Sequence, residues 1–173
     1  RWSEEPAPEE AKVILPGVGA FGAAMERLEP LRNEIEAFVA GGGPLLGICL
    51  GEQLLFETSE EMGEHTGLGL LPGRVKYLPK LPGIKVPHMG WNALEPSGEY
   101  AQSGPNTGLR PGDQVYFVHS LAAECDASLV AAWSSHGIRF PATVARGNVW
   151  GTQFHPEKSG DVGLRILRNF LEC

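Results

Sequence analysis

Cysteine, basic charge and long apolar runs are all scarce in this sequence. The chain has three cysteines in 173 residues, at positions 49, 125 and 173, and they form neither a Cys-x-x-Cys pair nor an even set. This usage indicates a reducing compartment, no disulfide framework and no cysteine-based metal site. It leaves one of the three as a candidate catalytic thiol.

The charge and hydropathy patterns exclude two classes of partner. Lys and Arg number 14 against 21 Asp and Glu, a net charge of -7 with no basic cluster to meet phosphates. No apolar run approaches membrane-spanning length, and no basic segment precedes an apolar one as in a secretory leader. We therefore expect a soluble, cytoplasmic protein that binds neither nucleic acid nor a membrane.

The bulk composition predicts one domain. A hydrophobic content of 42% in 173 residues is enough for one well-buried α/β core, so residues 1–173 are expected to form a single domain. The 23 glycines and 14 prolines indicate many tight turns between short elements.

The chain is organised around residues 44–53, Pro-Leu-Leu-Gly-Ile-Cys-Leu-Gly-Glu-Gln. A short apolar run that ends in Gly-x-Cys-x-Gly predicts a strand, a sharp turn at Cys49 and a helix. Glycines stand two positions to either side because side chains there would collide where the backbone reverses. The helix N-terminus near Leu50 is expected to favour the thiolate of Cys49. The alternative is an inert core cysteine after a strand.

Alternating elements in the first half of the chain predict a doubly wound, mostly parallel sheet of the flavodoxin-like kind. The expected elements are a buried strand at 11–15, helices at 21–28 and 31–39, the strand before Cys49, and a helix from Leu50 with residues 54–56 packed inward and its solvated end at residues 60–61.

The second half predicts an antiparallel layer added to that core. Seven short strands lie between Gly, Pro and Ser turns, at 75–78, 85–86, 91–94, 115–118, 129–133, 141–144 and 149–152. Residues 146–148 are typical of a hairpin turn, and an apolar stripe over 159–171 predicts a final helix.

A thiol nucleophile needs a base, and the base needs a group that orients its ring. His155 and Glu157 provide this pair, because residues i and i+2 of an extended segment share a face and Pro156 keeps the segment extended. The alternative for Glu157 is a cap on the final helix.

An oxyanion hole is the third requirement of this chemistry. Gly17, Val18 and Gly19 end the strand expected beside the Cys49 strand, and glycines there let bare N–H groups approach a carbonyl. The N–H of Leu50, directly after the nucleophile, is the other expected donor. A plain turn is the alternative for residues 16–19.

Together, the segments 16–19, 47–53 and 153–157 resemble the class I (triad) glutamine amidotransferases over nearly the whole chain. Four segments are similar, more specifically, to the glutaminase subunits of imidazole glycerol phosphate synthase, an enzyme of histidine biosynthesis: 16–22, 86–92, 116–120 and 155–159.

The resemblance implies a substrate and a reaction without a cofactor. Cys49 would attack the side-chain amide of glutamine to give a thioester and ammonia, and water would release glutamate. Gln53 and Ser120 resemble residues that contact the substrate. The family commonly has Tyr after that Ser, whereas this chain has Leu121, so only backbone contacts are expected there.

The resemblance also implies a partner. In these enzymes ammonia passes to a (β/α)8-barrel cyclase subunit, which makes imidazole glycerol phosphate and aminoimidazole carboxamide ribonucleotide. Trp91, Asn92, Tyr116 and Lys158 match positions that line the interface of this heterodimer. For Trp91 the alternative is ordinary core packing. The remaining histidines lack metal-ligand spacing and are interpreted as structural or solvated.

One departure concerns the start of the chain. The family opens with a strand and helix before the segment matching residues 1–15, so an N-terminal βα unit is expected to be missing. Residues 1–10 are polar and proline-rich. Two alternatives stay open: a glutaminase of another pathway, such as pyridoxal phosphate synthesis, and a scaffold that keeps the turn but has lost turnover.

Overall fold

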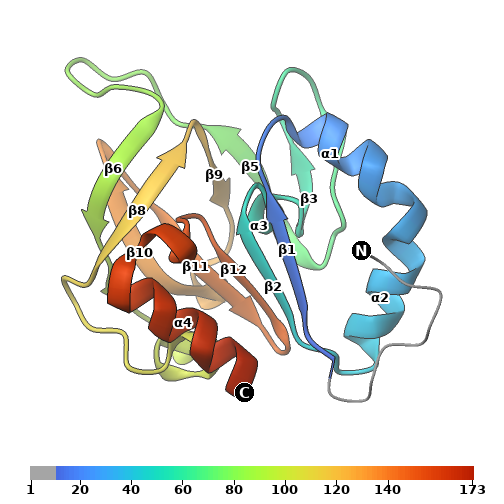
Figure 1. The fold of residues 1–173 in the computed structure, drawn as a ribbon. Coiled ribbons are helices and arrows are strands. Elements are labelled where there is room, and N and C mark those ends of the chain that lie inside the picture. Colours follow the sequence, from blue (N-terminus) through green and yellow to red (C-terminus); the bar gives the residue numbers. More distant parts are fainter. Residues whose placement is uncertain (1–10) are drawn as a thin grey trace.

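The computed structural model describes residues 11–173 and contains a central sheet of six strands (Figure 1). Its parallel core places β2 between two neighbours, and three antiparallel strands extend the sheet on one side. The order across the sheet is β1 (Val13–Gly17), β2 (Leu45–Cys49), β12 (Val149–Thr152), β11 (Ile138–Arg146), β10 (Val130–His136) and β7 (Glu95–Pro96).

Two smaller sheets stand beside the central one. The first has the order β4 (His65–Thr66), β3 (Phe56–Ser59), β5 (Leu71–Tyr77) and β9 (Leu121–Glu124). The second is an antiparallel pair, β6 (His88–Ala93) and β8 (Gln114–His119).

Four α-helices accompany the sheets in the described part of the chain: α1 (Phe21–Leu28), α2 (Arg32–Ala40), α3 (Leu50–Gln53) and α4 (Gly160–Glu172). Short 3-10 turns occupy Glu29–Leu31, Glu99–Gln102, Gly104–Asn106, Ala127–Leu129 and Pro156–Lys158. None of the helices within residues 11–173 is long and apolar enough to cross a membrane.

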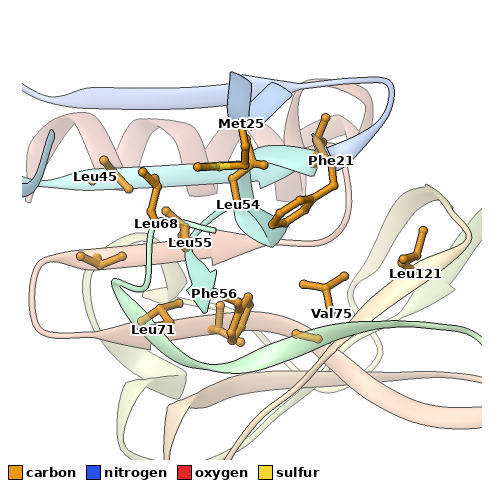
Figure 2. Packing of buried hydrophobic residues seen from close by; sticks show 14 of the residues in the cluster. Phe21, Met25, Leu45, Leu54, Leu55, Phe56, Leu68, Leu71, Val75 and Leu121 are labelled. Atoms are coloured by element: carbon orange, nitrogen blue, oxygen red, sulfur yellow. The ribbon is translucent and has the colours of Figure 1, made fainter. Parts of the chain in front are cut away.

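The central strand β2 is buried along its whole length. Because successive side chains of a strand point to opposite faces, β2 contributes to the core on both sides of the sheet. Leu45 belongs to the cluster that includes Phe21 of α1 (Figure 2), whereas Leu46 belongs to the cluster that includes Phe170 of α4. Helices α1 and α4 therefore lie on opposite faces of the parallel core, as Figure 1 also shows.

The predicted fold class is confirmed: an α/β fold with a parallel core and added antiparallel strands. The helix expected at 21–28 and the strand expected at 149–152 have the predicted bounds. The expected hairpin turn joins β11 to β12, and the final helix spans Gly160–Glu172.

Three expectations for single elements are wrong. Strand β1 is not buried but alternates half-buried and exposed residues, because it is the outermost strand of the described sheet. The helix after Cys49 ends at Gln53, and Phe56 begins β3, which pairs in parallel with β5. Residues 85–86 form no strand. The polar segment at 1–10 lies outside the described residues.

Candidate functional site

The backbone reverses sharply at Cys49, where β2 ends and α3 begins. Cys49 has φ 54° and ψ -110°, a region that L-residues with a side chain rarely adopt. The flanking glycines allow this turn: a Cβ on Gly51 would lie 1.7 Å from the Leu15 carbonyl oxygen, and one on Gly47 would lie 2.6 Å from the Gly51 oxygen. The expected reason for both glycines is thus confirmed, and the thiol projects from the carboxyl end of β2.

His155 and Glu157 form the second part of the site. His155 is 4% exposed, and its Nδ1 donates a hydrogen bond of 2.7 Å to Glu157 Oε1. A carboxylate on Nδ1 fixes the ring and leaves the lone pair of a neutral imidazole on Nε2. That Nε2 is buried, and nothing within residues 11–173 hydrogen-bonds it. Glu157 makes no capping bond to α4, whose N-cap residue is Ser159.

A cavity of about 300 Å³ joins these groups. Its wall comes from the end of β1, the turn at Cys49, the β8–β9 connection and the segment after β12. The lining residues are Val18, Gly19, Cys49, Leu50, Gln53, Glu61, Pro87, Val118, His119, Ser120, Leu121 and His155. The structure thus brings Cys49, His155 and the predicted substrate contacts, Gln53 and Ser120, to one pocket.

The thiol of Cys49 makes no hydrogen bond to His155 within the described residues. Its Sγ instead donates to the Val118 carbonyl at 3.8 Å and accepts from Gln153 Nε2 at 3.9 Å. Burial raises the pKa of the Cys49 thiol to about 11, and the backbone N–H of Leu50 offsets only part of this. The N-terminus of α3 thus acts in the expected direction, since the Leu50 N–H lowers the pKa of the thiol, but this helix has a single turn and desolvation outweighs its effect.

The predicted oxyanion residues lie in two groups. Gly17 pairs in register with Cys49 on the neighbouring parallel strand, but it does not line the cavity. Val18, which is 83% exposed, and Gly19, with φ 104°, do line it. Leu50 lines it from the carboxyl end of the neighbouring parallel strand, β2. The ends of both strands thereby meet at the cavity that Cys49 lines.

Two side-chain amides are hydrogen-bonded to each other beside the nucleophile. Gln53 Nε2 donates to Gln153 Oε1 at 2.8 Å and to the Leu121 carbonyl at 3.2 Å. Leu121 therefore contributes its backbone oxygen to the site, and its side chain is buried. Ser120 is half-buried at the cavity wall.

Sequence reasoning missed three groups of the site. Gln153 and the Val118 carbonyl contact the sulfur, and Glu61 supplies a carboxylate to the cavity while its Oε2 accepts from the Phe21 N–H at 2.5 Å. The sequence predicts Glu61 at the solvated end of a helix, and no local pattern marks it as a pocket residue. For Gln153 a signal existed, since it precedes His155 by two positions in the same extended segment.

The residues predicted for a partner interface lie on neighbouring elements. Trp91 of β6 is 57% exposed and packs edge-on against Tyr116 of β8, with ring centroids 6.1 Å apart. Lys158 is exposed in the turn after His155. The backbone N–H of His155 donates a hydrogen bond to the Tyr116 carbonyl, so this turn lies next to β8. Asn92 is half-buried and donates to the Ser135 carbonyl at 2.6 Å. Trp91 is thus not a core residue.

Three other histidines contact one another beside the cavity, which His119 lines. His88 and His119 are buried, and His88 Nδ1 lies 3.0 Å from His119 Nε2, while His119 Nδ1 donates to the Leu121 carbonyl. His136 stacks on His88. Burial lowers the pKa of His88 to about 4 and that of His119 to about 3. Within residues 11–173, no three His, Cys, Asp or Glu side chains are grouped to hold a metal ion.

Comparison with known proteins gives concordant results. The family model "Glutamine amidotransferase class-I" matches residues 3–173. Imidazole glycerol phosphate synthase subunit HisH of Bacillus thuringiensis (strain Al Hakam) is 51% identical over 160 residues, which are 91% of this chain and 74% of that protein. HisH of Bacillus anthracis matches to the same extent.

Solved structures share the fold. A crystal structure of a glutamine amidotransferase superposes with a TM-score of 0.67 at 25% identity and covers 95% of this chain and 79% of that one. The structure of PurLQS from Thermotoga maritima gives a TM-score of 0.65 at 20% identity, with 92% and 78% covered.

Proposed function

Because the chain belongs to the class I glutamine amidotransferases, and within them to the HisH subunits of imidazole glycerol phosphate synthase, we propose that its pocket splits glutamine into glutamate and ammonia. Cys49 is the nucleophile, His155 the general base and Glu157 the group that orients His155. The observation that carries this proposal is the shared cavity of about 300 Å³, with Cys49 at a strained turn and His155 held by Glu157.

The thiol of Cys49 must lose its proton for the sulfur to attack the amide. Since burial raises the pKa of Cys49 to about 11, the resting group is a thiol, and His155 Nε2 takes its proton as Sγ attacks the amide carbon. The oxygen that gains charge is stabilised by N–H groups of Val18, Gly19 or Leu50, next to Gly17. His155 returns the proton to the leaving ammonia, and water then cleaves the thioester to glutamate.

The cavity also suits the amino-acid end of glutamine. Glu61 is the only acidic side chain among the lining residues, and it provides a counter-charge for the α-ammonium group. The Ser120 hydroxyl lies on the cavity wall and suits a contact to the α-carboxylate. Gln53 donates both of its Nε2 hydrogens within the protein, so it offers the substrate only its side-chain oxygen as an acceptor.

The ammonia is delivered to a partner. We infer a heterodimer with a (β/α)8-barrel cyclase subunit that makes imidazole glycerol phosphate and aminoimidazole carboxamide ribonucleotide. An exposed Trp91 supports this inference, because an aromatic side chain that is more than half exposed on a strand pair is typical of an interface anchor. Asn92, Tyr116 and the exposed Lys158 extend this surface toward the cavity.

A covalent label tests the catalytic assignment. In complex with the cyclase, 6-diazo-5-oxo-L-norleucine, a glutamine-like electrophile, should modify Cys49 far faster than the exposed Cys173, and peptide mass spectrometry would measure both rates. C49S should abolish labelling and glutamate release, whereas C173S should change neither. Equal labelling of the two cysteines, with no glutamate release, would overturn the enzyme proposal in favour of a scaffold.

A second arm separates the pathways. The complex should form with the imidazole glycerol phosphate cyclase and not with a pyridoxal phosphate synthase barrel, as measured by size-exclusion chromatography. Assembly with the pyridoxal phosphate synthase barrel alone would mean that the chain is the glutaminase of that pathway.

A further inference from the structure

We propose that Gln153 is a positioning residue of this site, whose carboxamide holds the Cys49 sulfur and the Gln53 side chain in a fixed relation and favours negative charge on the sulfur. The proposal rests on the glutaminase function above. It assigns a task to a residue that lies outside the Cys-His-Glu set and outside the predicted substrate contacts.

The position of Gln153 is rigid. The residue has no solvent exposure, and its backbone N–H donates to the Ala142 carbonyl of β11 at 3.0 Å. It directly follows β12, the strand that pairs in parallel with β2. The same short segment continues to His155, so the backbone that places the base also places this amide.

The orientation of the carboxamide is set by its neighbours. Gln153 Oε1 accepts from Gln53 Nε2 at 2.8 Å, which requires the oxygen to face Gln53. The Nε2 group then faces Cys49 Sγ at 3.9 Å. A flipped amide would place two NH₂ groups against each other and leave the sulfur without a side-chain donor, so the observed arrangement is the one that satisfies all three residues.

The two hydrogen bonds of the sulfur respond oppositely to ionisation. The contact with the Val118 carbonyl requires the thiol proton, because Sγ is the donor there. The contact with Gln153 requires only a lone pair and strengthens as the sulfur gains charge. Gln153 therefore stabilises the nucleophilic form relative to the resting thiol, in a site where burial opposes ionisation.

The same amide links the nucleophile to the substrate wall. Gln53 donates its second N–H to the Leu121 carbonyl at 3.2 Å, so a continuous path runs from Cys49 through Gln153 and Gln53 to the wall of the cavity. Loss of the Gln153 carboxamide removes a hydrogen bond from Gln53 as well as one from the sulfur. The choice of substitution separates these two losses.

The test uses the complex with the cyclase and two substitutions. Q153M keeps the approximate volume but removes both hydrogen bonds, whereas Q153E keeps an acceptor for Gln53 and removes the amide donor to Cys49. The readout is the pH profile of Cys49 alkylation by iodoacetamide, followed by peptide mass spectrometry. T143V serves as the matched control, because Thr143 is buried on β11 and makes no hydrogen bond through its hydroxyl within the described residues.

Both substitutions should move the alkylation profile to higher pH, with a rate at pH 8 about tenfold below that of the unmodified chain. They should lower kcat for glutamine by a similar factor, and T143V should change neither quantity. An unshifted profile in Q153E, with Q153M affecting only KM, would mean that Gln153 merely supports Gln53 and would overturn the proposal.

The outcome for Gln153 is distinct from that for the proposed function. Alkylation reports on the sulfur without any turnover of glutamine, so a shifted profile supports the positioning role even where no glutamate is formed. An unmodified complex that alkylates normally but releases no glutamate refutes the glutaminase instead. If Q153M does not fold, Q153L takes its place, because it also removes both hydrogen bonds and adds no carboxylate charge beside the sulfur.

Discussion

Glu52 packs against Gly151 so closely that a Cβ on Gly151 would lie 2.4 Å from the Glu52 Cγ. The Glu52 carboxyl is fully buried behind the catalytic turn, and neither of its oxygens has a hydrogen-bond partner within residues 11–173. Burial raises its pKa from 4.5 to about 8. The folded chain thus holds an uncharged carboxylic acid next to the nucleophile at neutral pH.

Replacing Glu52 should stabilise the fold in a pH-dependent way. The folded-state pKa lies above the unfolded value, so this group costs stability increasingly as pH rises from about 4.5 to about 8. At pH 7 the cost is on the order of 3 kcal/mol. E52M should therefore raise the free energy of unfolding at pH 7 to 8 and change it little at pH 5, as measured by urea denaturation.

A matched control for that measurement is E34M, at an exposed position on α2. This variant should show no added pH dependence. A gain in E52M that is the same at pH 5 and pH 8 would mean that packing, and not the carboxyl charge, is responsible.

The turn at Cys49 should not tolerate a side chain at position 51. A Cβ on Gly51 would overlap the Leu15 carbonyl, which belongs to the backbone of β1 and has no freedom to move aside. We expect G51A to destabilise the chain by about 3 kcal/mol or more and to reduce labelling of Cys49. Thermal unfolding by circular dichroism measures the first effect.

G41A is the comparison for that experiment. Gly41 has φ -75° at the end of α2, and the nearest atom to its Cβ would be 3.3 Å away, so a shift of less than about 1 kcal/mol is expected. Similar losses in G41A and G51A would contradict the steric explanation.

The buried histidines should make the fold sensitive to acid. The pKa of His88, at about 4, and that of His119, at about 3, lie below the usual value of 6.5. The unfolded chain therefore binds protons first, and stability is lost as pH falls from 6.5 toward 4. The free energy of unfolding, measured between pH 7.5 and 4.5, should decline with a slope that H88Q reduces. Ring proton shifts of His119 that titrate near pH 6.5 in NMR spectra would contradict this prediction.

Glutaminase activity should be weak in the isolated chain and rise when the cyclase and its nucleotide ligand are added. The resting sulfur is bound to the Val118 carbonyl and not to His155, and the oxyanion segment at Val18 and Gly19 is exposed. We expect at least about a tenfold increase in glutamate release, since one oxyanion donor is worth a hundredfold or more. Equal turnover with and without the cyclase would contradict this.

Two substitutions locate the surface that transmits this activation. W91A should reduce the stimulation by the cyclase because Trp91 is exposed on β6. L164A, at an exposed position on α4 outside the proposed interface, should leave the stimulation unchanged. The cyclase concentration that gives half-maximal glutamate release measures both effects.

Local patterns in the sequence were sufficient for several elements but not for those decided by pairing. The sequence predicts helix α1 with its observed bounds, because the apolar period and the turn residues next to it are all local features. The apolar residues at 54–56 suit either a helix or a strand, and the pairing of β3 with β5 selects the strand. Such pairing is a tertiary effect that no local window contains.

The same distinction applies to the site. The spacing of His155 and Glu157 predicted their contact, because two residues of one extended segment suffice for it. The contact of Gln153 with Cys49 joins residues 104 positions apart, and the high pKa of the thiol follows from burial by several elements. Neither could be inferred before the chain was folded.

The contact between the Leu15 carbonyl and Gly51 has a mechanical consequence. It joins β1, the outermost strand of the described sheet, to the backbone directly behind the nucleophile, with no side chain between them to absorb a displacement. A displacement of β1 would therefore be passed directly to the backbone at Gly51, two residues after Cys49. Such a transmission would need no relay of flexible side chains, only two stretches of main chain that cannot slide independently.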